Sequence, residues 1–203
     1  MTLQHSTAPV LVTGASGYIA SWVIQKLLKQ GYTVHATVRD LNKTQSYTHL
    51  EQIADSSPGT LKLFEANLLK PGSFDAAMEG CEIVFHMASP FVVTNYEDAL
   101  KDIIEPAILG TQNVLNSVNK TESVKRVIVT SSIASTYGDA IDILQTEHTS
   151  FDESHWNTTS SETHQPYPYS KVMAERKAWE MAEAQDRWDL ICINPALVFG
   201  ESL

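Results

Sequence analysis

Short apolar runs alternate with amphipathic segments along most of the chain. The runs are bounded by turn residues and predict strands over 9–14, 33–39, 61–67, 82–89, 126–132 and 190–196. The segments between them predict helices over 17–31, around 47–55, over 72–80, near 97–119 and over 169–185. Strands that are apolar on both faces and alternate with helices indicate a parallel sheet covered on two sides. We therefore expect an α/β fold, a doubly wound parallel sheet with a ligand at the carboxyl ends of its strands.

The length and composition fit a single soluble domain over 1–203. A chain of 203 residues with 43% hydrophobic and 19% charged residues has the makeup of an ordinary globular protein. No stretch approaches the roughly 18 apolar residues of a membrane span, and the N-terminus shows no secretory pattern. Cys81 and Cys192 each lie in an apolar stretch, so we expect reduced thiols in a cytoplasmic protein.

The charge of the chain limits its partners. A formal net charge of −10 argues against nucleic acid or an anionic membrane surface, because both require a basic face. The seven histidines are scattered without the spacing of metal ligands, so no metal site is expected. A small molecule held by a few local groups fits this composition.

A glycine-containing turn follows the first predicted strand. In "VLVTGASGYIA" (10–20), Gly14 and Gly17 stand between this strand and the first helix, and Ala20 allows the helix to lie close to the sheet. Glycine lets a pyrophosphate approach the backbone, and the helix N-terminus supplies unpaired N–H groups. A tight strand-to-helix turn without a ligand is the alternative. The position favours a dinucleotide-binding (Rossmann) turn, with candidate residues Gly14, Ala15, Ser16, Gly17, Tyr18 and Ile19.

The end of the second strand bears on which dinucleotide binds. A free ribose 2′-hydroxyl usually meets a carboxylate there, whereas a 2′-phosphate requires a cation. Here the strand ends in "TVRD", with Arg39 followed by Lys43. Both cations suit a phosphate, although Asp40 could pair with Arg39 instead, and both could be ordinary surface charges. We expect NADP(H) rather than NAD(H).

"HQPYPYSKVMAE" (164–175) contains a candidate proton donor. Tyr167 lies four residues before Lys171, one helical turn away, whereas Tyr169 lies two residues before it and should point elsewhere. A phenol has a pKa of about 10, and a nearby ammonium lowers it by stabilising the phenolate. The fifth strand ends in a serine pair, and a hydroxyl there, such as that of Ser132, can polarise a carbonyl oxygen.

Taken together, these motifs resemble a known family. "TGASGYIA", "TSSIAS" and "YPYSK", in this order, resemble the extended short-chain dehydrogenases/reductases. "ATVRD", "VFHMASP", "ILGTQNVL", "FDESHW" and "NPALVFG" are similar to the branch that contains dihydroflavonol reductase, cinnamoyl-CoA reductase and yeast-type aldehyde (methylglyoxal) reductase. The resemblance extends from about residue 9 to residue 200.

The resemblance implies roles for particular residues. Tyr167 would be the proton donor in carbonyl reduction, and Lys171 would lower its pKa and bind the ribose. Ser132, rather than Ser131, would orient the substrate carbonyl. The cofactor would also contact Arg39 and Lys43 at the 2′-phosphate, Asn67 and Leu68 near the adenine, Met87 and Ala88 along the channel, and Pro195 and Val198 near the nicotinamide.

Other aromatic residues receive structural roles. We expect Tyr169 in packing or in the wall on the substrate side, and Trp156 in the core. Members of the resembled family continue into a smaller C-terminal domain that covers the substrate, whereas this chain ends just past the sixth strand. The Rossmann domain would thus be present, with the substrate domain largely absent from this chain.

Three functions follow from this pattern. The first is an NADPH-dependent reductase of aldehydes or ketones that act as small-molecule substrates. The second is a nucleotide-sugar epimerase or dehydratase on the same scaffold. The third is a catalytically silent nucleotide-binding chain, because an open, wet site would position a substrate poorly.

Overall fold

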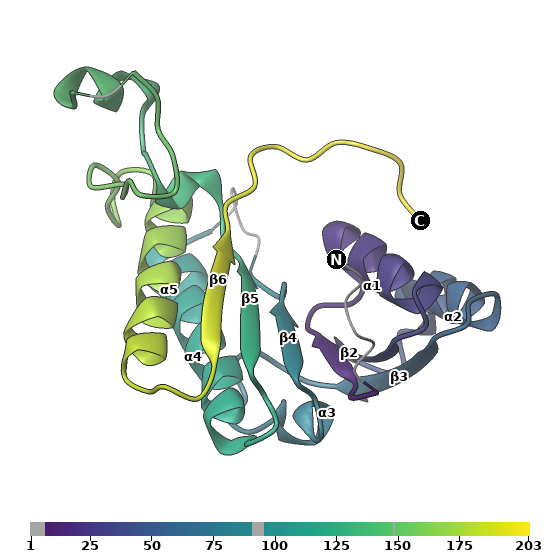
Figure 1. Ribbon diagram of the computed structural model, residues 1–203. Helices are drawn as coiled ribbons and strands as arrows, with labels where there is room; N and C mark the ends of the chain where they lie inside the picture. Colours follow the sequence, from purple (N-terminus) through teal and green to yellow (C-terminus); the bar gives the residue numbers. More distant parts are fainter. Residues whose placement is uncertain (1–6, 91–95, 148) are drawn as a thin grey trace.

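Six parallel strands form one sheet in the computed structural model, which describes residues 7–90, 96–147 and 149–203 (Figure 1). They are β1 (Val10–Val12), β2 (Thr33–Val38), β3 (Thr60–Glu65), β4 (Ile83–His86), β5 (Arg126–Thr130) and β6 (Asp189–Ile193). Their order is β3-β2-β1-β4-β5-β6. The chain thus starts in the middle of the sheet and winds outward in both directions, which confirms the predicted doubly wound fold.

The helices between the strands lie close to the predicted ranges. They are α1 (Tyr18–Lys29), α2 (Thr48–Asp55), α3 (Asp75–Met78), α4 (Glu105–Lys120) and α5 (Pro166–Glu183). Shorter turns are η1 (Thr44–Ser46), the π-type turn η2 (Leu100–Ile104) that leads into α4, η3 (Ile133–Ser135) and η4 (Ala140–Gln145). The predicted strands are longer than the observed ones because the predicted ranges include the first residues of the turns that follow, such as Thr13 and Gly14 after β1 and Ser131 and Ser132 after β5.

Two hydrophobic cores lie on opposite faces of the sheet. On one face α1 and α2 contribute side chains such as Ile24, Leu28 and Leu50 to a core with β1 and β2. On the other face α3, α4 and α5 pack against β4 and β5, with Met78 and Leu115 fully buried. The connections diverge between β1 and β4, and in such sheets a crevice opens there at the carboxyl ends of the strands.

The edge strand β6 departs from the expected two-sided burial. Ile191 and Ile193 are 37% and 49% exposed, whereas the neighbouring β5 residues Val127 and Val129 are buried. The sheet is therefore covered on both faces at its centre but not at this edge. No helix among the described residues is long and apolar enough to cross a membrane.

Helix α5 begins three residues earlier than the sequence predicts. Pro166 is its first residue, and Pro168 also lies in the first turn. Proline fits there because the first amides of a helix have no intrahelical acceptor and its fixed φ is already helical. Tyr167 therefore lies within the helix, one turn before Lys171, as the spacing of the two residues predicts.

Candidate active site

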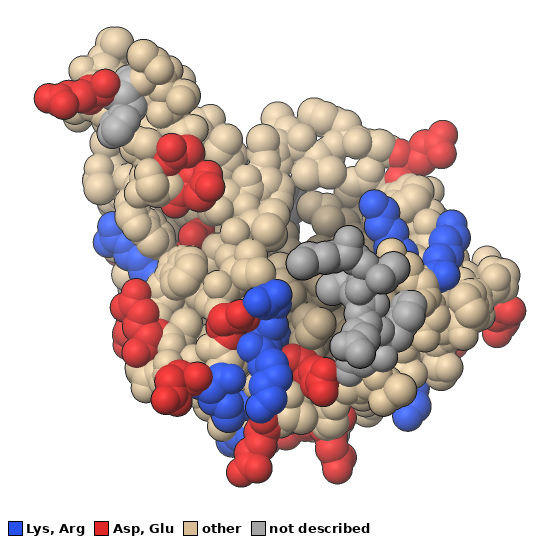
Figure 2. All heavy atoms as spheres, viewed as in Figure 1, with Lys and Arg blue, Asp and Glu red and all other residues tan. Residues whose placement is uncertain are grey.

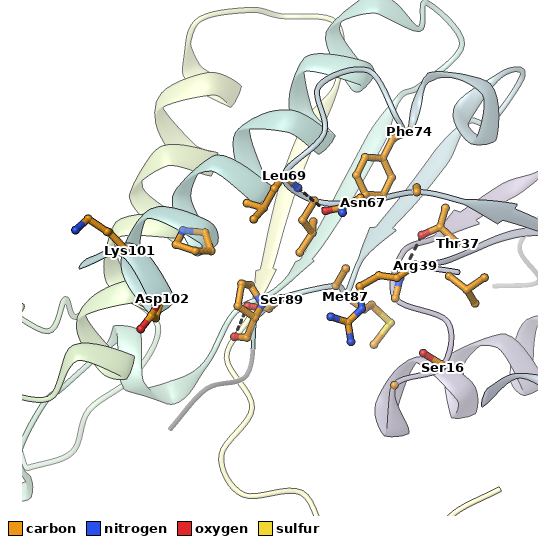
Figure 3. A pocket seen from close by; sticks show the side chains of 18 of the residues that line it. Ser16, Thr37, Arg39, Asn67, Leu69, Phe74, Met87, Ser89, Lys101 and Asp102 are labelled. Atoms are coloured by element: carbon orange, nitrogen blue, oxygen red, sulfur yellow. Dashed lines mark hydrogen bonds between the residues drawn. The ribbon is translucent and has the colours of Figure 1, made fainter. Parts of the chain in front are cut away.

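A cavity of about 1070 Å³ opens at the carboxyl ends of the strands (Figure 3). Its walls come from the β1–α1 turn, the ends of β2, β3 and β4, and the η2 segment. It thus coincides with the place where the doubly wound topology predicts a ligand. Eight of the predicted cofactor residues line it: Gly14, Ser16, Gly17, Arg39, Asn67, Leu68, Met87 and Ala88.

The β1–α1 turn requires its first glycine. Gly14 has a φ of +71°, and a Cβ at this position would lie 2.9 Å from the Cα of Ala88. The turn therefore lies directly against the end of β4. At the start of α1, the amides of Tyr18 and Ile19 belong to the first helical turn, where N–H groups have no acceptor within the helix. Such a turn can hold an anionic group such as a pyrophosphate.

Ala15, also predicted as a cofactor residue of this turn, supports the turn and does not face the cavity. Ala15 is fully buried, and its N–H donates to the Thr37 carbonyl at 2.9 Å. Gly14 N donates to Thr37 Oγ1 at 3.3 Å, so β2 supports the turn through Thr37. Ala15 therefore packs beneath the turn and is not part of the cavity wall. The side chains of Tyr18 and Ile19 do not line the cavity either.

The end of β2 presents a cation to the cavity. Arg39 is exposed and lines the cavity on the same side as Thr37 and Ser16 (Figure 3). The Asp40 carboxylate accepts a hydrogen bond from Asn42 N at 2.9 Å, and no ion pair of Arg39 occurs among the described residues. The competing Arg39–Asp40 pair is thus not formed. Lys43 is exposed but lies outside the cavity wall.

The segment after β3 contributes a polar and an apolar group. Asn67 Oδ1 accepts a hydrogen bond from Leu69 N at 2.9 Å, which fixes the Asn67 side chain at the cavity wall. Leu68 lies against α4, where a Cβ on Gly110 would be 3.1 Å from the Leu68 Cβ. Both predicted residues therefore line the cavity.

Ser132, Tyr167 and Lys171 come together beside this cavity. The side chains of Ser132 and Tyr167 share a hydrogen bond. Lys171 Nζ lies 5.6 Å from the centre of the Tyr167 ring and donates to Ser89 Oγ at 3.0 Å. Ser89 lines the cavity, so it links this group of three to the cavity wall.

Burial dominates the electrostatics of this group. It raises the pKa of the half-buried Tyr167, and the hydrogen bond with Ser132 acts in the opposite direction. The pKa of Tyr167 is thus raised overall by burial, and is not lowered overall as the spacing to Lys171 predicted. The Lys171 ammonium lies over the Tyr167 ring and donates its hydrogen bond to Ser89. Burial lowers the pKa of Lys171 itself to about 8.

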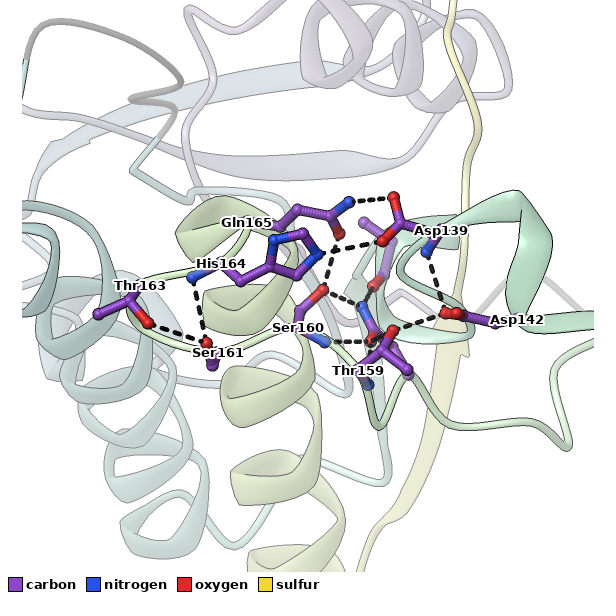
Figure 4. Close-up of polar contacts among 10 residues, drawn as sticks. Asp139, Asp142, Thr159, Ser160, Ser161, Thr163, His164 and Gln165 are labelled. Atoms are coloured by element: carbon purple, nitrogen blue, oxygen red, sulfur yellow. Dashed lines mark hydrogen bonds and ion pairs between the residues drawn. The ribbon is translucent and has the colours of Figure 1, made fainter. Parts of the chain in front are cut away.

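A network of polar contacts holds the segment before Tyr167 (Figure 4). Gln165 Nε2 donates to Asp139 Oδ1 at 2.7 Å, and Ser160 Oγ donates to Gln165 Oε1 at 2.9 Å. His164 Nε2 lies 3.1 Å from Asp139 Oδ2. Gln165 has a φ of +58°, a left-handed conformation that is uncommon outside glycine. The network stabilises this conformation and with it the position at which α5 begins.

The structure also locates Trp156, Pro195 and Val198, for which the sequence predicted a place in the core or near the nicotinamide. Trp156 is 36% exposed and stacks against the Arg176 guanidinium at 5.2 Å, so its predicted place in the core is wrong. Pro195 accepts a hydrogen bond from Ile133 N at 2.9 Å, which ties the chain after β6 to the segment that carries Ser132. Val198 is 47% exposed, and neither Pro195 nor Val198 lines the cavity.

Thr13 and Ser89 were not among the predicted site residues. Thr13 Oγ1 accepts hydrogen bonds from Met87 N and Ala88 N, both at 3.0 Å, and so fixes the end of β4 at the cavity. Ser89 is the hydrogen-bond partner of Lys171. Their only sequence signal was a small hydroxyl residue at the end of a predicted strand. Among the described residues, no three His, Cys, Asp or Glu side chains form a metal-binding group.

A family profile and several relatives match almost the whole chain. A profile of the NAD dependent epimerase/dehydratase family matches residues 10–202. The chain belongs to this family. Its similarity to a cinnamoyl-CoA reductase of Medicago truncatula is 44% identity over 197 residues, and to an anthocyanidin reductase of Arabidopsis thaliana 39% over 208 residues. The predicted resemblance to the extended short-chain dehydrogenases/reductases of this branch is thereby confirmed.

These relatives are longer than the chain itself. The alignments cover 96% and 100% of this chain but 59% of each relative. Among solved structures, Gre2 of Candida albicans in complex with NADPH superposes with a TM-score of 0.80 at 29% identity, covering 96% of this chain and 59% of Gre2. The chain therefore spans about 59% of the length of these relatives.

Proposed function

We propose that this chain is the cofactor-binding and proton-donating part of an NADPH-dependent carbonyl reductase. The observation that carries the proposal is the convergence of Ser132, Tyr167 and Lys171 beside the cavity, with a hydrogen bond between the Ser132 and Tyr167 side chains. Relatives with 44% and 39% identity are named as a cinnamoyl-CoA reductase and an anthocyanidin reductase, which supports the same class of reaction.

The cofactor is proposed from the cavity and from two neighbours. Gre2 from Candida albicans and yeast methylglyoxal/isovaleraldehyde reductase Gre2 were both solved with NADPH. The cavity fits such a group, because Gly14 and Gly17 leave the backbone open to a pyrophosphate. Arg39 would hold a 2′-phosphate, since its guanidinium is not engaged in an ion pair with Asp40 and lines the cavity.

The residues of the chain would carry the proton side of the reaction. When bound, NADPH supplies a hydride from nicotinamide C4, which would add to the carbonyl carbon of the substrate. Tyr167 would give its hydroxyl proton to the carbonyl oxygen, and an alcohol would form. Ser132 would donate a hydrogen bond to the same oxygen and orient it.

Lys171 would mainly stabilise the phenolate form of Tyr167, which develops as the proton is transferred. As a phenolate develops on Tyr167, the ammonium 5.6 Å from the ring would stabilise it, whereas the neutral phenol gains little. This makes the contribution of Lys171 largest during proton transfer. Lys171 lies next to Ser89 in the cavity wall, from where it would also reach cofactor hydroxyls.

The proposal is tested by measuring NADPH consumption with a panel of aldehydes and ketones, including cinnamaldehyde, methylglyoxal and benzaldehyde. Tyr167→Phe should lower kcat by about a hundredfold or more, because positioned acid catalysis typically contributes that much. NADPH affinity, measured by fluorescence titration, should change less than about twofold. Tyr32→Phe, which changes a tyrosine just before β2 that lies outside the cavity wall, is the control and should keep the native rate.

The outcomes separate the candidate functions. Equal turnover by the native and Tyr167→Phe chains would show that the tyrosine is wrongly assigned. NADPH binding without turnover of any carbonyl would favour a catalytically silent nucleotide-binding chain. NAD retained through purification, as in a nucleotide-sugar epimerase or dehydratase, would contradict both the cofactor and the reaction proposed.

A further inference from the structure

A buried carboxylate on α5 has no role in the mechanism above. Glu175 lies one helical turn past Lys171 and two turns past Tyr167, so the three side chains share a face of the helix. Glu175 is only 6% exposed. An ionised carboxylate at such a position is costly unless several hydrogen bonds satisfy it.

Donors from three elements satisfy this carboxylate. Ser131 Oγ donates to Glu175 Oε2, as do Ser135 Oγ at 2.6 Å and Asn194 Nδ2 at 3.0 Å. Trp179 Nε1 lies 3.4 Å from the other oxygen. Ser131 and Ser135 follow β5, Asn194 follows β6, and Trp179 belongs to α5. Glu175 therefore ties the helix that carries Tyr167 and Lys171 to the ends of two strands.

The same donors hold the backbone on which Ser132 stands. Ser135 Oγ lies 2.7 Å from the Ser132 carbonyl oxygen, and Asn194 Nδ2 lies 3.2 Å from it. Ser131, which bonds Glu175 directly, precedes Ser132 in the chain. The direction of the Ser132 hydroxyl toward Tyr167 thus depends on a cluster whose common acceptor is Glu175.

Glu175 also acts on Lys171 through its charge. Both residues line a small cavity of about 20 Å³ together with His86, which is enough room for one water molecule. The other titratable groups nearby are Tyr167 on the same helix, His86 on β4, and Cys192 on β6 beside Glu175. Burial lowers the pKa of Lys171, and the negative charge of Glu175 acts against this shift.

We propose that Glu175 is a positioning residue, whose carboxylate fixes the Ser132 segment against α5 and keeps Lys171 in its ammonium form. Its effect on turnover rests on the proposed reductase function. Its effect on the protonation of Lys171 does not, and can be measured without any turnover.

Two substitutions separate these two effects. Glu175→Gln keeps the length of the side chain and removes its charge, so the titration midpoint of Lys171 should fall by about one pH unit. Glu175→Asp keeps the charge and withdraws it by one methylene, so kcat should fall by about tenfold or more while the midpoint falls by less than in Glu175→Gln. Glu180→Gln, exposed on the same helix and paired with Lys177, is the matched control and should alter neither.

The midpoint is read from the ¹³Cε resonance of Lys171, assigned by its loss in Lys171→Met. The alkaline limit of kcat/KM should move to lower pH in Glu175→Gln by the same amount, because the amine form of Lys171 cannot stabilise the tyrosinate. KM should change less than kcat in both variants. A merely structural role would lower thermal stability without moving either pH value.

Each outcome bears on the proposal. An unchanged Lys171 midpoint in folded Glu175→Gln overturns the electrostatic effect, and native kcat in Glu175→Asp overturns the positioning effect. If Glu175→Gln does not fold, Glu175→Asp must still lose about tenfold or more in kcat while its Lys171 midpoint falls by less than one pH unit. If the native chain reduces no carbonyl, the reductase function fails, and the Lys171 midpoint alone decides the role of Glu175.

Discussion

At the scale of single residues, one hydroxyl organises the junction between β1 and β4. Thr13 Oγ1 already accepts two backbone hydrogen bonds, from Met87 and Ala88, so its own proton is directed to His86 Nδ1 at 3.1 Å. His86 Nδ1 must therefore be an acceptor, which requires a neutral imidazole. Burial and the neighbouring Lys171 ammonium agree with this, because they lower the pKa of His86 to about 4.

The neutral state of His86 makes the stability of the fold depend on pH. The unfolded chain binds a proton at His86 near pH 6.5, whereas the folded chain does so only near pH 4, so stability falls as the pH is lowered through this interval. Between pH 7 and pH 5, where most carboxyl groups remain ionised, this loss amounts to about 2 kcal/mol.

His86→Asn keeps an acceptor for Thr13 and cannot titrate, so this variant should not show the loss of about 2 kcal/mol in folding stability that His86 causes between pH 7 and pH 5. Urea unfolding of the native and variant chains at pH 7, 6 and 5 provides the measurement. The two free energies of unfolding should converge toward pH 5. Parallel curves would mean that His86 is protonated in the folded chain.

At the scale of elements, the pattern of apolar runs predicted the sheet well, because each run must cover one or both faces of it. The ends of the elements were less predictable: the range 126–132 includes Ser131 and Ser132, which follow the end of β5 at Thr130. Trp156 was misplaced because aromatic character suggests burial, whereas stacking on Arg176 at the surface depends on a residue 20 positions away in the chain.

In the candidate site, the features predicted from the sequence are local motifs, whereas the features that were missed depend on residues far apart in the chain. The β1–α1 turn and the Tyr167–Lys171 pair are local patterns, visible in a few consecutive residues. The role of Glu175 was not visible, because its partners Ser131, Ser135 and Asn194 lie 44, 40 and 19 positions away. Only the fold brings them together, and a single Glu on a helix otherwise resembles a surface charge.

The β1–α1 turn offers a matched pair of substitutions. Gly14 and Gly31 both have left-handed backbones, with φ of +71° and +85°, so alanine at either position should destabilise the fold by about 1 kcal/mol. A Cβ on Gly31 meets nothing within 4 Å, whereas a Cβ on Gly14 meets Ala88 at 2.9 Å and forces the turn away from β4.

Gly14→Ala should therefore weaken NADPH binding by about tenfold or more, because the turn is displaced from the cavity. Gly31→Ala should leave the affinity unchanged. Fluorescence titration with NADPH and thermal unfolding, measured on both variants, distinguish the two effects. Equal loss of affinity in the two variants would show that general destabilisation, rather than the position of the turn, controls binding.

At the scale of the whole molecule, the chain is acidic, and the Lys and Arg side chains of the described residues form no large basic patch on the face shown in Figure 2. On the face shown in Figure 2, Lys and Arg side chains stand singly or in small groups among Asp and Glu, in keeping with the net charge of −10. An anionic ligand must therefore be held by local donors, namely helix amides and Arg39, rather than by a general positive field. Under the proposed function, the specificity for a phosphorylated dinucleotide would therefore depend strongly on Arg39.

The described residues form the walls of the cavity on both halves of the sheet, so cofactor binding should not require the additional length of the relatives. NADPH at about 100 times its Kd should stabilise the chain by about 2.7 kcal/mol, which raises Tm by about 5–10 °C for a domain of this size. NADH at the same concentration should raise Tm less, because it lacks the phosphate that Arg39 would hold.

Arg39→Ala should remove most of the difference between the two nucleotides while leaving the response to NADH. Lys26→Ala, which removes an exposed cation of α1 outside the cavity wall, should keep the preference for NADPH. Thermal unfolding of the three chains with each nucleotide gives the comparison. Equal shifts with NADH and NADPH in the native chain would mean that Arg39 is an ordinary surface charge, and the 2′-phosphate would then have no selective contact on this side of the cavity.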